Sequence, residues 1–305
     1  MDQGLWVGYK WIEPKSFYNR IFLNSNWRFS KLLKPIGDID QQYQEANVNF
    51  NINIQSKKLW WLGSFTNLMF RGNDFYEPRK NGWFFRRGAR LVFGGWFESN
   101  EAKKYSFSSE VFTRTFFNFY NGFSYQVSLR QQYRFNNKLT VSHRINTNPW
   151  FNNIGYAFVP NSSEINFARR RRNTIENILF VKYSFTNKMG LTFRARHYLS
   201  NVYNKKFYLL QKDGSLKPAA FVNEADQNFN LFNIDMVYTW QFAPGSFINI
   251  VWKDAAQHFT RNVEDSYFKN FRQTIESDQN NNISLKVIYF LDYLELKKLK
   301  KKKRQ

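Results

Sequence analysis

The chain has 305 residues, a formal net charge of +22, a mean hydropathy of −0.61 and an aromatic content of 20%. This aromatic content argues against disorder, and the absence of cysteine excludes disulfides and thiolate-ligated metals. The surplus of lysine and arginine predicts an anionic partner, and no run of about 18 apolar residues could form a transmembrane helix.

Alternation of apolar and polar residues with a period of two is the dominant pattern. In 46–55, Ala, Val, Phe and Ile alternate with Asn and Gln, and 122–135 separates aromatic and aliphatic residues from Ser, Gln and Arg. Such alternation predicts strands with one apolar face. In chain order, we expect strands at 4–12, 17–30, 44–55, 59–71, 82–95, 104–112, 122–135, 138–147, 171–185, 190–200, 228–242, 246–253 and 282–291, with a weaker pattern at 151–159.

The predicted connections differ in length along the chain. Short ones lie at 13–16, 56–58, 136–137, 187–189 and 243–245, and long ones at 31–43, 72–81, 113–121, 148–170, 201–227 and 254–281. All seven prolines fall outside the predicted strands, as expected because proline cannot donate to a strand ladder. Tight turns at one end and long loops at the other are typical of outer-membrane barrels.

The expected fold is therefore all-β, an antiparallel up-and-down transmembrane β-barrel of about 13–14 strands over residues 1–293, with a basic tail at 294–305. With the short turns in the periplasm, the first strand would start outside, so an odd strand number implies at least one strand before Met1. The first residues also lack a signal-peptide pattern. We expect the chain to be the C-terminal portion of a longer exported protein.

A soluble β-sandwich would also alternate apolar and polar residues. Three features favour the membrane: the strands are long, hairpin polarity is constant, and aromatic residues lie near strand ends. Barrels carry aromatic girdles at both membrane interfaces. The predicted girdle consists of Trp11, Trp60, Trp61, Trp83, Trp240, Trp252, Tyr289 and Tyr293.

Two stretches resemble a known family. The hairpin at 233–253, with its Ala-Pro-Gly-Ser turn, and the closing segment at 284–293 are similar to the C-terminal region of the Bacteroidota family called domain of unknown function 5916. The resemblance implies a longer protein, with an N-terminal sandwich similar to carbohydrate-binding module family 9 followed by an outer-membrane barrel. Nothing in this chain matches that sugar-binding sandwich.

The end of the chain departs from the expected pattern. Barrel proteins commonly stop at a terminal aromatic residue, whereas 297–304 is a basic run. Tyr289, Leu291 and Tyr293 are the candidates for the assembly signal. The tail itself is typical of a solvated basic end rather than of a binding motif.

The polar strand face carries a cluster of cationic residues. Two interpretations stay open: a basic lumen wall that favours an anionic solute or docks an acidic plug, or a structural Arg–Glu ladder across a small closed lumen. Glu176 is the nearest expected acid, with Glu110 and Asp235 further away. The wall consists of Arg130, Arg134, Arg144, Lys182, Arg194 and Arg196.

A run of four arginines, Arg169, Arg170, Arg171 and Arg172, lies at the mouth of a predicted strand. Arginine forks suit phosphate, so the run is a candidate contact for lipopolysaccharide phosphate, against the alternative of a solvated loop. Nucleic acid is not expected as a partner, because the aromatic residues and the arginines occupy opposite strand faces.

Catalytic and metal motifs are absent from the sequence, and we expect no catalytic residue, cofactor or metal. His143 and His197 have no Ser or Asp two residues away on their strands, although a cross-strand partner stays open, and His258 near Asp254 is expected in a loop. The predicted function is a non-enzymatic outer-membrane β-barrel in contact with outer-membrane lipid and lipopolysaccharide. It would act as a channel or as the anchor of an upstream domain, for which glycan binding is one candidate role. The alternatives are a soluble secreted or periplasmic glycan-binding β-sheet module and a barrel-embedded hydrolase.

Overall fold

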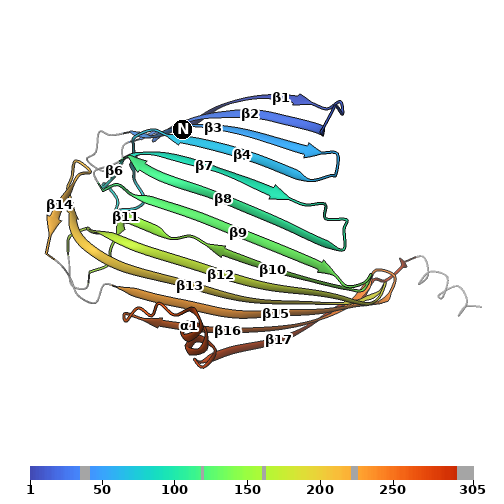
Figure 1. Cartoon of the computed structure of the whole chain (residues 1–305). Coiled ribbons are helices and arrows are strands. Elements are labelled where there is room, and N and C mark those ends of the chain that lie inside the picture. The colour runs from blue at the N-terminus through green and yellow to red at the C-terminus, as the bar shows by residue number, and fades with distance from the viewer. Residues whose placement is uncertain (35–41, 118–119, 160–162, 221–225, 294–305) are drawn as a thin grey trace, which may run out of the picture.

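A computed structural model describes residues 1–34, 42–117, 120–159, 163–220 and 226–293. The predicted basic tail at 294–305 lies outside the described residues. One 15-stranded antiparallel sheet dominates the molecule, and its main path follows the chain order (Figure 1). The main path consists of β1 (Asp2–Trp11), β2 (Tyr18–Lys31), β3 (Tyr43–Ser56), β4 (Trp61–Met69), β7 (Ala89–Glu98), β8 (Tyr105–Phe117), β9 (Phe123–Arg134), β10 (Leu139–Thr147), β12 (Asn166–Thr186), β13 (Met189–Leu210), β15 (Gln227–Ala243), β16 (Ser246–Thr260) and β17 (Gln279–Ile288).

The all-β antiparallel prediction is confirmed, and the main path has the thirteen strands expected from the alternation. Every neighbouring pair on the path is antiparallel, so the strands form a continuous meander. In the described part of the chain, β1 pairs only with β2, and β17 pairs only with β16. The described sheet is thus curved and open, with one free edge at each end of the path (Figure 1).

The two ends of the sheet differ. Tight connections such as 187–188 and 244–245 lie at one end, drawn on the right of Figure 1, and the long connections gather at the other. Two predicted loops contain regular structure instead: the 201–227 region includes β14 (Leu216–Ala219), and the 254–281 region includes helix α1 (Tyr267–Ile275). In the 148–170 region, β11 (Trp150–Tyr156) forms where the weaker strand pattern at 151–159 was noted.

The long arms of β12 and β13 explain part of this difference. They have 21 and 22 residues, well beyond the roughly 9–11 that a tilted strand needs to cross a bilayer. Their outer halves carry polar and apolar residues mixed on both faces, which obscures the alternation that predicts strands, yet the two arms pair with each other from Asn166↔Leu209 onward. Pro218 lies in β14, which pairs only with β13 in the described chain; such an edge position tolerates proline.

The register assigns each side chain to one of two faces, because residues paired across antiparallel strands point the same way. We call the side that carries Ser124, Ser128 and Arg130 in β9 the polar face, and the side that carries Leu129 and Tyr133 the apolar face. The asparagines of β3 lie on the polar face, where Asn26, Asn49 and other amides form a hydrogen-bonded cluster across β2, β3 and β4.

Burial is reversed relative to a soluble sheet. On the apolar face of β9, Phe123, Tyr125, Leu129 and Tyr133 are 37–38% exposed, whereas Ser124 on the polar face is fully buried. The same reversal occurs on β3, where Phe50 is 49% exposed. Large apolar side chains are therefore exposed on the apolar face over much of this sheet.

Two smaller units sit at the end with the long connections. The hairpin of β5 (Gly72–Asp74) and β6 (Phe85–Arg87) forms a separate two-stranded sheet, and Phe85 packs on the fully buried Phe167 of β12. Helix α1 packs on the apolar face of the sheet, where its Phe271 contacts His197 of β13 and Phe232 of β15. Near this end, the exposed apolar side chains of the apolar face give way to buried polar side chains beneath α1, among them Asn228, Asn230 and Asn270. We call these buried residues the covered polar layer.

Candidate functional site

The six residues of the predicted basic wall lie on the polar face of four neighbouring strands, β9, β10, β12 and β13. The register places Arg130 opposite Arg144, and Lys182 opposite Thr192 on the strand that carries Arg194 and Arg196. Their common face follows from the pairings Arg144↔Ile178↔Arg196. The structure therefore brings the predicted residues together on one surface.

Acids neutralise only part of this wall. Arg196 forms a 2.5 Å ion pair with Glu176, and Arg130 lies 3.7 Å from Glu101, an acid that the sequence did not suggest. Asp235, expected further away, is directly opposite Arg194 in the register. Among the described residues, Arg144, Lys182 and Arg194 make no ion pair within 4 Å.

The arginine run at 169–172 is divided between the two faces of the sheet. Arg170 pairs with Asn204 and Arg172 with Val202 on the polar face, whereas Arg169 and Arg171 point to the opposite side. Arg171 lies over the ring of Phe151, 5.7 Å from its centroid. The run is part of strand β12, so it does not form a single surface for one phosphate group.

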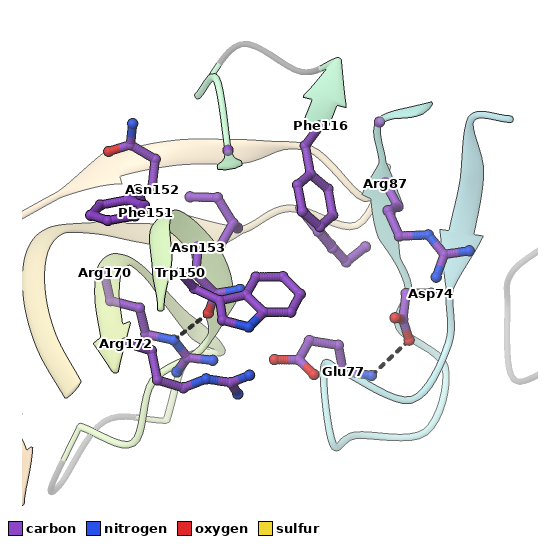
Figure 2. A pocket seen from close by; sticks show the side chains of 14 residues that line it. Asp74, Glu77, Arg87, Phe116, Trp150, Phe151, Asn152, Asn153, Arg170 and Arg172 are labelled. Carbon is purple, nitrogen blue, oxygen red and sulfur yellow. Dashed lines mark hydrogen bonds between the residues drawn. The ribbon is translucent and has the colours of Figure 1, made fainter. Parts of the chain in front are cut away.

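Arg170 and Arg172 instead line a cavity of about 200 Å³ at the polar-face end of the sheet (Figure 2). We call it the arginine pocket. Its walls come from the β5–β6 hairpin, the end of β8, β11 and the outer arm of β12. The residues that define it are Asp74, Glu77, Arg87, Trp150, Arg170 and Arg172.

Arg170 is fixed on one side of the pocket. Its Nε donates to Asn153 Oδ1 at 2.7 Å and its Nη1 donates to the carbonyl of Tyr156 at 2.9 Å. Glu77 lies close enough to attract the guanidinium, and its Oε1 accepts the backbone N–H of Tyr156 at 2.7 Å. The β5–β6 connection and β11 are thereby joined across the pocket.

Trp150 stands between the two sides of the pocket, with Arg172 and Arg170 on one side and Phe116 and Arg87 on the other (Figure 2). The Arg172 guanidinium lies 5.1 Å from the indole centroid, a favourable cation–π distance. Arg87 donates from Nη2 to Glu45 at 2.7 Å. The pocket thus combines an aromatic wall with three guanidinium groups.

The predicted girdle residues do not all share one environment. Trp11 and Trp240 lie on the apolar face near the tight turns, and Trp60 packs there on Phe97. Trp61 is different: it pairs with Gln55 and Glu98 on the polar face and stacks on Phe22.

The remaining members are spread along the molecule. Trp252 is in the interior of β16 on the apolar face, and Trp83 packs near Lys212 at the end with the long connections. Tyr289 stacks on Phe242 just after β17, and Tyr293 is 72% exposed beyond it. Position near a strand end therefore did not determine which face a tryptophan occupies.

The side chains of His143 and His197 form hydrogen bonds with an amide and a phenol, respectively. His143 Nε2 is 3.2 Å from Asn177 Oδ1, and His197 Nδ1 is 3.0 Å from the hydroxyl of Tyr267 in α1. His258, expected in a loop, lies in β16 opposite Asn230. No group of three His, Cys, Asp or Glu residues that could hold a metal occurs in the described part of the chain.

Sequence reasoning found Arg170 and Arg172 but not the pocket. Glu77, Arg87 and Trp150 come from segments separated by tens of residues, and 72–81 had been expected to be a plain loop. The only hint in the sequence is that residues 71–87 are rich in Gly, Asn, Asp, Arg and aromatic residues. No sequence pattern indicates that this segment contacts 150–172.

No helix in the described residues is long and apolar enough to cross a membrane. A comparison with curated proteins finds no match. A protein-family model does match, over residues 1–300, which is nearly the whole chain and includes the 233–253 hairpin that suggested the resemblance. The chain therefore belongs to the family described as domain of unknown function (DUF5916).

Proposed function

We propose that this chain is an integral outer-membrane β-barrel region without enzymatic activity, which serves as a channel or as the membrane anchor of an upstream domain. The observation that carries the proposal is the reversed burial: aromatic and aliphatic side chains are exposed on one face of the meander, whereas the polar side chains on the other face of β9 are buried or half-buried. Monomeric soluble proteins rarely expose apolar patches larger than a few hundred Å². Lipid is the solvent that stabilises such a surface.

The lengths of the strands are consistent with this environment. From the tight turn at Met189 to His197, where the covered polar layer begins, β13 has about the 9–11 residues that a tilted strand needs to cross a bilayer. Beyond that point α1 covers the apolar face with buried amides, which would be unfavourable in hydrocarbon. In this proposal, the membrane span ends where α1 begins to cover the apolar face, and α1 lies outside the hydrocarbon layer.

Unpaired strand edges are not tolerated in lipid, because each free N–H and C=O group costs several kcal/mol. The proposal therefore requires that β1 and β17 find partner strands in the membrane, either each other or further strands. The hydrogen-bonding edges of both strands are available for this pairing in the described chain.

The polar face is the proposed lumen wall. Arg144, Lys182 and Arg194 project from adjacent strands without ion pairs among the described residues, so they would give a water-filled interior a positive potential. Such a potential favours an anionic solute or an acidic plug. The partner amides and phenol of His143 and His197 support a non-enzymatic role, since neither imidazole is aligned with a hydroxyl nucleophile of Ser or Thr.

Fractionation of the full-length protein tests membrane integration. We expect it in the outer-membrane fraction, resistant to extraction by alkaline carbonate, and with gel migration that changes on heating. Recovery in the soluble fraction without detergent would contradict the proposal and favour a secreted glycan-binding β-sheet module.

Conductance tests the channel role separately. Full-length protein in planar bilayers should conduct anions better than cations, and the double variant Arg144→Glu/Arg194→Glu should weaken or reverse that preference. Lys188→Glu, in the exposed tight turn between β12 and β13, is the matched charge control and should leave selectivity unchanged. Clear cation selectivity of the unmodified protein would refute the basic wall, and absence of conductance would leave the anchor role.

A further inference from the structure

The arginine pocket gathers more positive charge than its acids neutralise. Arg87 is paired with Glu45, and Arg170 lies near Glu77. Among the described residues, the Arg172 side chain has no acid within ion-pair distance and no hydrogen-bond partner. Its Nε is buried and unpaired there. One of the three guanidinium groups that line the cavity therefore lacks a counter-charge.

A second layer of arginines lies behind the lining. Arg114, 4.3 Å from the ring of Phe112 and 5.2 Å from that of Trp150, is close enough to Arg90 and Arg172 for their charges to repel one another. Arg90 is in turn close to Arg87. Like charges this close and this poorly hydrated destabilise each other unless an anion neutralises them.

Four acids stand against these five guanidinium groups: Asp74 and Glu77 in the lining, Glu45 beside Arg87 and Arg90, and Glu110 near Arg114. Asp74 accepts the backbone N–H groups of Tyr76 and Glu77 at 3.0 and 2.9 Å, and Glu77 accepts that of Tyr156. Both carboxylates thus hold the backbone of the pocket wall in place. Their positions shape the cavity, and the five guanidinium groups exceed the four acids around them by one positive charge.

The aromatic part of the lining adds a flat apolar surface. Trp150 and Phe116 are tilted toward each other with centroids 5.5 Å apart, and both line the cavity with the arginines (Figure 2). Pockets that hold small organic ligands combine such apolar walls with a few convergent polar groups. An anionic group attached to a carbon skeleton matches this combination.

We propose that the arginine pocket binds a phosphate monoester, with the phosphate held by Arg172 and Arg170 and the attached organic group against Trp150. Arginine forks recognise phosphate through paired N–H donors, and a dianion neutralises more of the surplus charge than a carboxylate does. The proposal goes beyond the membrane role and does not depend on conduction. Two sources carry this chemistry: a soluble sugar phosphate, or the phosphorylated headgroup of a glycolipid such as lipid A.

Calorimetric titration of the full-length protein in detergent micelles tests the site. Glucose 1-phosphate should bind, inorganic phosphate should compete with it, and glucose should not bind. Arg172→Gln should weaken glucose 1-phosphate binding at least about tenfold, the size expected when one charge-assisted contact is lost. Arg20→Gln, an arginine of the same face near the tight turns and outside the basic wall, is the matched control and should bind as the unmodified protein does.

Two further variants separate binding from folding. Arg172→Lys keeps the charge but not the fork and should bind with intermediate affinity, while Trp150→Phe should weaken glucose 1-phosphate more than inorganic phosphate. Heat-dependent gel migration of each variant reports folding independently of ligand.

The source of the phosphate is decided with the protein in nanodiscs. Displacement of glucose 1-phosphate by bisphosphorylated lipid A, but not by dephosphorylated lipid A, would identify the headgroup as a ligand. Binding of glucose 1-phosphate without such displacement would identify a soluble ligand. The proposal is overturned if neither phosphate compound nor lipid A binds the unmodified protein, or if folded Arg172→Gln binds as tightly as Arg20→Gln.

Discussion

Single positions along β9 show how the surface differs from that of a soluble sheet. Leu129 and Tyr133 on the apolar face are each 37% exposed, while Ser124 on the polar face is fully buried and Arg130 is half-buried. In water this arrangement would leave hydrocarbon hydrated and partly desolvate charge, both of which are unfavourable. In a bilayer around a wet interior, the same arrangement places each group in its preferred solvent.

Leu129→Arg distinguishes the two environments. On a lipid-facing barrel position near the bilayer centre, arginine costs about 2–4 kcal/mol of folding free energy. At an exposed position of a soluble sheet, the change would fall within about 0.5 kcal/mol. We expect the larger loss, measured by urea unfolding of the full-length protein in lipid vesicles, with Asn137→Arg in the exposed β9–β10 turn as the control.

The limits of sequence reasoning are clearest in the arginine run. Composition and position suggested that Arg169 to Arg172 act together, but strand geometry sends alternate members to opposite faces. Arg170 and Arg172 then meet Glu77 and Trp150 only because the β5–β6 hairpin and β11 fold over the same end of the sheet. Such long-range packing leaves no period in the sequence.

Among the elements, helix α1 depends on buried amides rather than on apolar packing alone. Asn270 is fully buried; its Oδ1 accepts from Asn228 and Asn230 at 2.9 Å each, and its Nδ2 donates to the carbonyls of Glu264 and Ser266. All of these groups lose partners if the amide is removed. Beside the contacts of Tyr267 and Phe271, Asn270 thus forms the buried polar link between the helix and the sheet.

Asn270→Ala should detach or loosen α1. Each buried polar group left without a partner costs about 1–3 kcal/mol, so hydrogen exchange across 267–275 should rise by tenfold or more. Arg272→Ala is the control, because its exposed ion pair with Glu276 contributes only about 0.3–0.5 kcal/mol. Equal exchange in both variants would show that Asn270 does not hold the helix.

The β15–β16 turn illustrates a local rule that sequence predicts well. Gly245 follows Pro244 and has φ of +71°, and a Cβ there would lie 2.9 Å from Cβ of Phe290. Gly190 in β13 lacks both constraints, since the nearest atom to its added Cβ is a carbonyl oxygen at 3.6 Å. The Pro-Gly pair was expected to form a tight turn, and it does.

Gly245→Ala should therefore destabilise the fold by about 1–2 kcal/mol through left-handed backbone strain, in addition to the crowding against Phe290. Gly190→Ala should have a much smaller effect. Urea unfolding midpoints of the two variants in vesicles provide the comparison, and similar midpoints would contradict this account of the turn.

At the scale of the whole molecule, the strand meander could be predicted because alternation is a local property of each strand. The order of strands, the tight turns and the two faces all follow from it. The outer arms of β12 and β13, the helix and the arginine pocket could not be predicted, because their polar and apolar residues follow no regular alternation and are ordered by contacts between distant segments. The sequence thus predicts the strand order and the two faces of the sheet, but not the helix and the arginine pocket at its end.

The reversed faces of the sheet are the central claim, and the cysteine-free sequence allows a direct test. Spin labels on single introduced cysteines at positions 123–134 of the full-length protein in vesicles report accessibility to oxygen, which favours lipid, and to a water-soluble nickel chelate. We predict a period of two through β9, with oxygen accessibility highest at 125, 127 and 129 and nickel accessibility at 126, 128 and 130. High nickel accessibility at Leu129 and its neighbours on the apolar face would contradict the membrane account.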